Sequence, residues 1–306
     1  MWFKNLRVYR FSRPCDITAD SLETALTEFS FKPCGSQDRQ QLGWVTPLGK
    51  HGQTLLHVAN NNLLVCMRRE ERVLPSAVVK EALDAKVAEI EEAQGRPVPR
   101  KEQQTLKEEI EMQLLPRAFT RSQMTFAYIS PANNLLVVDA SSAGKADELV
   151  SLLRKTVGSL PVVPLTSKTN PAACMTEWVK NGPLPDGFGL LEEAELRDAS
   201  EDGGLIRCKQ QDLTSDEIYA HLEAGKMVTK LALDWRERLT CLLEQELVIK
   251  RLKFNDILRE ESGNADDIDA VAKFDADFML MCGELANFIP ELMESLGGEE
   301  ISELNG

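Results

Sequence analysis

The stretch from Leu74 to Arg121 constrains the fold most, because it has the pattern of two helices inserted between strand-rich segments. Gly95, Pro97 and Pro99 interrupt the helical pattern, and Pro116 is expected to end the second helix. Glu and Lys dominate the other faces, so each helix has a narrow apolar stripe and the hairpin is expected to project. The stripes consist of apolar residues at helical spacing: Val79, Leu83, Val87, Ile90, Leu106, Ile110 and Leu114.

The hairpin ends in a Pro-Arg-Ala-Phe-Thr-Arg run that places Phe119 between Arg117 and Arg121. A phenylalanine flanked by arginines could stack on a base or wedge into a duplex step. It could equally be a structural plug that holds the hairpin to the rest of the chain. From the residue types alone, the plug is the favoured interpretation.

The segments around the hairpin predict one α/β domain that the hairpin interrupts. Asn-rich turns are expected in both β-hairpins of this domain, because Asn tolerates a positive φ. The expected elements are a strand over Trp2–Phe11, a helix from Asp20 to Phe29, a strand over Leu42–Pro47, β-hairpins over Leu55–Arg69 and Met124–Ala140, a helix over Lys145–Val157 and a strand over Leu160–Leu165.

From Asn170 onward the pattern indicates a second sheet and a long final helix. Alternation predicts that Lys230, Asp234 and Arg236 lie on one face of a strand, opposite Leu231, Leu233 and Trp235. The stripe of the last helix, from Val271 to Leu292, either packs on this sheet or forms a subunit contact. The expected elements are a helix over Ala172–Lys180, strands over Leu190–Leu196 and Leu205–Gln210, a capped helix over Thr214–Glu223, and strands over Met227–Arg238 and Leu247–Phe254.

The charge is distributed unevenly along the 306 residues, whose formal net charge is -14. Residues 1–169 carry 22 Lys and Arg against 19 Asp and Glu, whereas residues 170–306 carry 13 against 30. A negative net charge does not exclude binding to nucleic acid, because the local electrostatic potential decides binding. Within the acidic half, residues 226–253 hold seven Lys and Arg against four Asp and Glu.

Cysteine spacing and hydropathy predict a cytoplasmic protein with no membrane span. The seven cysteines include no CxxC pair, so a reduced compartment fits better than a disulfide framework or a zinc knuckle. No window approaches the roughly 20 apolar residues of a membrane helix, and the first residues do not resemble a signal peptide.

The sequence lacks the common enzyme motifs, which predicts a protein that is not an enzyme and needs no cofactor. His57 lies in an expected strand, where a structural role is favoured over a metal ligand. The acidic residues near the last helix could be interpreted as a metal cluster, but helix-dipole stabilisation is favoured, so no metal site is predicted. These residues are Asp266, Asp267, Asp269, Asp275 and Asp277.

Basic residues on the expected second sheet are candidates for contact with phosphates. Phosphate contacts give binding that is strongly salt-dependent and insensitive to sequence. Composition alone supports an ordinary solvated face equally well. The candidates are Lys226, Lys230, Arg236, Lys250, Arg251 and Lys253, together with Lys209, Gln210 and Gln211 at a strand end and Arg117 and Arg121 beside Phe119.

Several long segments, in order across essentially the whole chain, resemble the bacterial recombination-associated RdgC family. Matches of this length are far more specific than any short motif. The segments are WFKNLRVYR, PCGSQD, GWV, HVANN, LLPRAF, SLLRKTVGSLPVVPL, MTEWV, DLTSDEI, EAGKMVTKLALDW, KRLKF and FDADFMLM, with Cys282 before a final GEL.

The resemblance implies a non-enzymatic, nucleoid-associated protein that binds double-stranded DNA without sequence preference. In the family, a ring-shaped homodimer encloses the duplex, restrains RecA-promoted strand exchange and is associated with replication restart. The alternative is a protein-interaction inhibitor that acts directly on RecA, with DNA binding secondary. The family's functional positions correspond to Phe119, Gln210 and Gln211, where Gln210 replaces a lysine of some relatives.

The fold class expected on this basis is α+β with three parts. Residues 1–74 and 121–169 form a central α/β domain, and residues 75–120 form the inserted helical tip. Residues 170–306 form a C-terminal base of mixed sheet and helix. Two subunits are expected to meet tip to tip and base to base.

Overall fold

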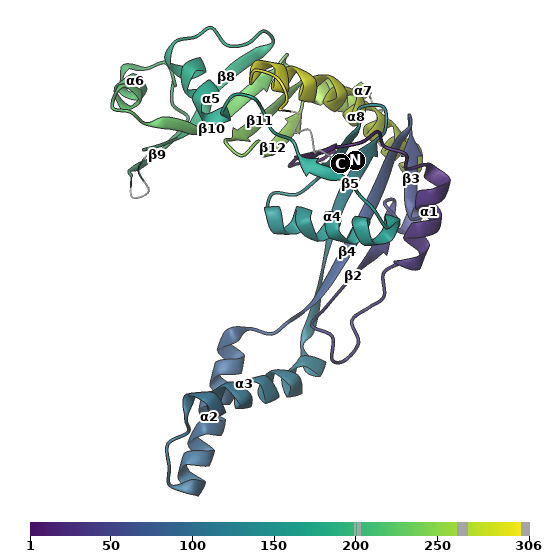
Figure 1. Ribbon diagram of the computed structural model, residues 1–306, viewed down its shortest axis with the longest axis vertical. Coiled ribbons are helices and arrows are strands. Elements are labelled where there is room, and N and C mark those ends of the chain that lie inside the picture. Colours follow the sequence, from purple (N-terminus) through teal and green to yellow (C-terminus); the bar gives the residue numbers. More distant parts are fainter. Residues whose placement is uncertain (199, 201–202, 262–268, 301–306) are drawn as a thin grey trace.

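The computed structural model describes residues 1–198, 200, 203–261 and 269–300. It contains two antiparallel sheets and, within these residues, eight α-helices, which confirms the expected α+β class. The molecule is bowed (Figure 1). A helical hairpin and the smaller sheet project from the two ends of the larger sheet, toward the same side.

The larger sheet has seven strands in the order β2-β4-β5-β6-β1-β7, with β3 also paired to β4. Asn60, Asn61 and Asn134 adopt positive φ at the two hairpin turns, as their residue type predicts. The strands are β1 (Arg7–Phe11), β2 (Gln40–Val45), β3 (Leu56–Ala59), β4 (Asn62–Val73), β5 (Phe119–Ser130), β6 (Leu135–Val138) and β7 (Val162–Pro164).

Both faces of this sheet are covered. Helices α1 (Ala19–Glu28) and α4 (Ala143–Val157) pack on one face, where Leu22, Leu149 and Trp44 are fully buried. Helix α8 (Ala270–Ser295) contacts the other face through Phe278, which lies against Tyr128 of β5. This double coverage explains why β4 begins with six consecutive buried residues.

The inserted segment forms the expected hairpin of helices, α2 (Ser76–Gln94) and α3 (Arg100–Leu114). Gly95 ends α2 in the left-handed conformation, and a short turn, Leu115–Arg117, follows α3. Only Val79 in α2 and Ile110 in α3 are buried, which confirms the prediction of narrow apolar stripes. The hairpin stands on a ribbon formed by the far ends of β4 and β5.

The smaller sheet has five strands in the order β12-β11-β10-β8-β9. The sequence pattern missed β11, which lies between the two strands that were expected to pair with each other. Its sequence shows no alternation of apolar and polar residues, because Cys241, Leu242 and Leu243 are apolar and buried although they point to both faces of the sheet. The strands are β8 (Phe188–Arg197), β9 (Leu205–Lys209), β10 (Met227–Trp235), β11 (Leu239–Glu244) and β12 (Ile249–Phe254).

Helices α5 (Pro171–Lys180), α6 (Asp216–Glu223) and α8 cover one face of the smaller sheet, and α7 (Asp256–Glu261) follows β12. The apolar stripe of α8 therefore packs on the sheets of its own chain, which is the first of the two alternatives expected for it. The side-chain cap expected for α6 is wrong: Ser215 is the N-cap residue but makes no capping hydrogen bond. Instead, Asp212 accepts hydrogen bonds from Thr214.

The first six residues do not extend β1, contrary to the expectation of a strand from Trp2. They cross to the smaller sheet, where Leu6 and Ile249 exchange backbone hydrogen bonds. The Met1 amine forms a 2.6 Å ion pair with Asp277 of α8. One continuous apolar core consequently contains residues of both sheets and of α8. The division into three domains stays a prediction.

His57 of β3 packs against α8, as a structural histidine does. Its ring lies edge-on to Phe274 and Phe278, and its Nε2 atom is 3.2 Å from Asp275 Oδ1. Burial lowers the pKa of His57 below its ordinary value, and the neighbouring Asp275 carboxylate opposes this shift only in part.

Stability is therefore expected to fall on acidification through the range in which a free histidine titrates. Below about pH 6.5 the unfolded chain binds a proton at His57 that the folded chain still resists, so protonation favours unfolding. Thermal unfolding measured between pH 7.5 and 5.5 should show this loss, and His57→Gln should flatten it. An unchanged slope in the variant contradicts the assignment.

Two further expectations concern membrane-spanning helices and the environment of the cysteines. No helix among the described residues is both long and apolar enough to cross a membrane. Cys66, Cys208, Cys241 and Cys282 are buried and none is in a disulfide, so these four serve as small apolar residues. Burial raises the pKa of the Cys66 thiol to about 12.

Candidate nucleic-acid interface

One face of the smaller sheet, opposite the face that carries the helices, is charged rather than apolar. We call it the charged face. Seven cations and four anions lie on it, a balance of +3 in a chain whose net charge is -14. Its members are Arg197, Arg207, Lys209, Lys230, Lys250, Arg251 and Lys253, with Glu193, Glu195, Asp234 and Glu244.

Ion pairs run across the strands of the charged face as a ladder of alternating sign. Lys250 lies 2.8 Å from Glu244, and Lys230 bridges Glu244 at 3.5 Å and Glu195 at 3.3 Å. Arg207 of β9 completes the ladder at 3.0 Å from Glu195. Both carboxylates are buried beneath the cations, so the positive groups form the outer layer.

The Glu195 carboxylate of the ladder stays ionised at neutral pH. Burial acts to raise the pKa of Glu195, but hydrogen bonds from Arg207 and Lys230 outweigh it and hold the pKa below its ordinary value. The cations are thereby held in fixed positions, which lowers the entropy lost when they bind an anion.

Lys209, Gln210 and Gln211 lie where β9 ends, at the edge of the charged face. Lys209 is exposed and pairs in register with Glu193 of β8. Gln210 adopts a φ of 52°, and the Gln211 N–H donates to the Glu192 carbonyl at 3.3 Å. The left-handed turn at Gln210 thus directs consecutive polar side chains away from the strand.

Two predicted cations lie away from the charged face. Arg236 is in the turn after β10 and donates two hydrogen bonds to Glu291 of α8, so its expected place beside Lys230 is wrong. The chain reverses there through positive φ at Arg236 and Glu237, which ends the strand alternation. Lys226 precedes β10, is largely buried and lies 3.5 Å from Asp198.

The charged face also contains two arginines that were not among the sequence candidates. Arg207 alternates with Ile206 and Cys208, so the period of β9 could have placed it beside Lys209. Arg197 lies at the end of β8, 4.0 Å from Glu195. A bulge at Arg251, whose φ is 50°, keeps Lys250 and Lys253 on the same face.

Phe119 begins β5 at the root of the helical hairpin, and its side chain is 88% exposed. The favoured interpretation as a plug is therefore wrong for the single chain. Arg117 and Arg121 are exposed as well, and Arg121 shares a face of β5 with Phe119. The root of the hairpin presents an aromatic ring flanked by two cations.

Arg72 holds this root in place. Its guanidinium donates to the carbonyls of Leu115 and Ala118 at 3.1 Å and to the Gly35 carbonyl at 3.0 Å. These bonds connect β4, the loop before β2 and the turn that leads into Phe119. An ion pair between Arg39 and Glu111 adds a second polar connection to α3.

Apart from Lys226 and Arg236, the predicted site residues therefore form two groups at opposite ends of the bow (Figure 1). One is at the hairpin root and the other is on the charged face. Within the described ranges, no three His, Cys, Asp or Glu side chains gather in a way that could hold a metal ion. Asp266 and Asp267 lie outside those ranges, Asp275 contacts His57, and Asp277 contacts the Met1 amine.

These features define a class: a two-sheet α+β protein with a projecting helical hairpin and an exposed sheet face rich in cations. A family model described as "Putative exonuclease, RdgC" matches residues 1–299. The chain belongs to the RdgC family.

Similar proteins named "Recombination-associated protein RdgC" cover nearly the whole chain. The protein of Tolumonas auensis is 56% identical over 300 residues, 98% of this chain and 99% of the relative. The Aeromonas hydrophila protein is 56% identical over 302 residues, 99% and 100% of the two chains. The Psychromonas ingrahamii protein is 52% identical over 300 residues, 98% and 99% of the two chains.

Proposed function

We propose that this protein binds double-stranded DNA without sequence preference, as a ring of two copies, and thereby restrains RecA-promoted recombination. The observation that carries the proposal is the charged face, a positive surface on an acidic chain. Cations at strand intervals suit the repeating phosphates of a duplex, and the acidic remainder of the surface discourages adhesion elsewhere.

The bowed shape supports a ring. Two bowed chains related by a twofold axis and joined at both ends would enclose an opening (Figure 1). The hairpin has exposed apolar side chains that a second copy could cover, namely Val78, 45% exposed, and Met112, 61% exposed. Its small buried stripe suits a contact that can separate, which a ring needs in order to load onto closed DNA.

The direct test is the salt dependence of binding to unrelated duplexes. With six or more phosphate contacts, affinity is expected to fall on the order of a thousandfold between 50 and 200 mM salt. Fluorescence anisotropy with labelled duplexes of different sequence measures both properties. Salt-insensitive binding, or strong preference for one duplex, contradicts the proposal.

The name of the matching family model makes an exonuclease the second candidate. The described residues offer no cluster of metal-ligating side chains, and the relatives are named for recombination rather than for cleavage. Incubation of end-labelled linear duplex with the protein and Mg²⁺ decides between the two. The nuclease is favoured if nucleotides are released, if the rate of release rises with protein concentration, and if this activity stays with the protein through each purification step.

A further inference from the structure

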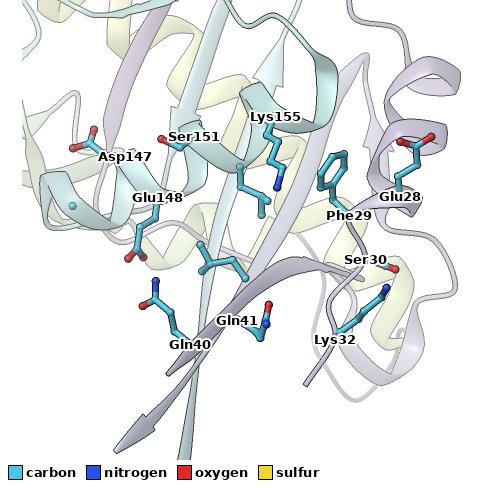
Figure 2. Close-up of a pocket in the computed structure, with 13 residues that line it drawn as sticks. Glu28, Phe29, Ser30, Lys32, Gln40, Gln41, Asp147, Glu148, Ser151 and Lys155 are labelled. Atoms are coloured by element: carbon cyan, nitrogen blue, oxygen red, sulfur yellow. The ribbon is translucent and has the colours of Figure 1, made fainter. Parts of the chain in front are cut away.

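One cavity in the described part of the chain lies away from both candidate DNA-binding groups. It has a volume of about 690 Å³ and lies between the end of α1, the strand β2 and the outer side of α4 (Figure 2). Pockets that hold ligands typically measure roughly 300–1,000 Å³. Phe29, Leu42 and Leu152 contribute apolar surface to it.

The strand that borders this cavity is an open edge of the seven-stranded sheet. Trp44 donates its N–H to Phe29 and accepts from the Phe31 N–H, so the groups of Trp44 point away from β4. Leu42, two residues earlier, points its N–H and C=O in the same outward direction. None of the described residues forms a hydrogen bond with this N–H or this C=O.

The segment that covers Trp44 does not continue along the edge. After Phe31 the chain crosses so closely over Gly43 that a Cβ atom there would lie 2.3 Å from the Phe31 Cα atom. The edge beside Gln40 and Leu42 is therefore left facing the cavity, as Figure 2 shows for the strand and its glutamines. An unpaired edge is where an added strand binds.

The two ends of the cavity carry opposite charges. Lys155, whose Nζ atom lies 5.4 Å from the centre of the Phe29 ring, and Lys32 are at one end. Neither lysine forms an ion pair with any described residue. Asp147 and Glu148 are at the other end, where Arg69 lies 3.4 Å from Glu148. Glu28 points away from the centre of the cavity.

We propose that this cavity binds an extended peptide segment of a partner protein, added as a strand beside Gln40–Leu42. The segment has an acidic residue toward Lys32 and Lys155, a basic residue toward Asp147, and an apolar side chain between them on Leu42 and Leu152. Backbone hydrogen bonds to Leu42 supply affinity, and the opposite charges at the two ends set the orientation.

The charge pattern favours a peptide over nucleic acid. A duplex backbone is negative along its whole length, so the carboxylates of Asp147 and Glu148 would repel it. The apolar floor formed by Phe29, Leu42 and Leu152 also offers a phosphate no donor. A peptide with one charge of each sign satisfies both ends of the cavity.

An array of decapeptides provides the probe. Each has a central Val-Leu-Val, two Asp or Glu at one end and two Lys or Arg at the other, in both orders. The tightest binder, labelled with fluorescein, is then titrated with full-length protein by fluorescence anisotropy. We expect Lys32→Glu with Lys155→Glu to weaken binding at least tenfold, and N-methylation of alternate central amides of the peptide to abolish it.

Lys145→Glu with Arg154→Glu is the matched control, because both residues are exposed on α4 and neither lines the cavity. This double variant should leave peptide binding unchanged. The N-methylated peptides test strand addition with the protein unaltered, so a folding defect cannot imitate the result. The proposal is overturned if no peptide binds, if N-methylation has no effect, or if duplex DNA competes with the peptide and the lysine variants lose DNA binding instead.

Discussion

Replacement of Lys250 and Lys253 by glutamate is expected to weaken duplex binding about a hundredfold at moderate salt. Under the proposed function each reversal removes a phosphate contact and adds a repulsive charge, and the two residues lie on the same face of β12. Fluorescence anisotropy measures the loss of affinity. The slope of log affinity against log salt should also become shallower, by about the amount that two phosphate contacts contribute.

Arg13→Glu with Lys50→Glu changes the net charge equally at exposed positions outside the charged face and serves as the control. Lys253→Glu alone avoids disturbing the pair between Lys250 and the buried Glu244 and should give part of the effect. The same variants separate the proposed restraint of RecA through DNA from direct action on RecA. If strand exchange is still inhibited after DNA binding is lost, the protein acts on RecA directly.

Phe119→Ala is expected to lower duplex affinity about tenfold while leaving thermal stability nearly unchanged. A buried phenylalanine typically costs ~3–5 kcal/mol on truncation, whereas an exposed one contributes within about 0.5 kcal/mol. With an exposed fraction of 88%, Phe119 belongs to the second group, and we expect its ring to contact a base or a second copy. Thermal unfolding and anisotropy together measure both outcomes.

Val73→Ala is the control for Phe119→Ala, because Val73 is its exposed partner across the ribbon. It should change neither property. Sedimentation of Phe119→Ala without DNA shows whether the phenyl ring acts on DNA or on association between copies. A fall of many degrees in the unfolding temperature would restore the plug interpretation.

Local patterns predicted most of the elements. Helical spacing in a run broken by Gly95 and Pro97 identified the hairpin, and the Asn-rich turns identified both β-hairpins. The order of strands could not be predicted, because it depends on contacts between distant segments. The strand β11 was missed since burial on both faces removes the alternation that marks a strand.

The positions of site residues could be predicted where side chains alternate regularly along a strand. They could not be predicted where the backbone leaves the strand conformation. Lys230 lies as alternation predicts. Arg236 does not, because a turn with positive φ redirects it toward α8. The exposure of Phe119 was equally out of reach, since it depends on how Arg72 fixes the turn before it.

The shared core around α8 determines how this molecule unfolds. Because Phe3, Tyr128, Phe278 and Phe288 belong to one apolar cluster, neither sheet can lose its packing while the other keeps all of its own. The two sheets should therefore melt in a single cooperative transition. The helical hairpin is excluded from that unit, since so little of it is buried, and it should open and exchange its amide hydrogens independently.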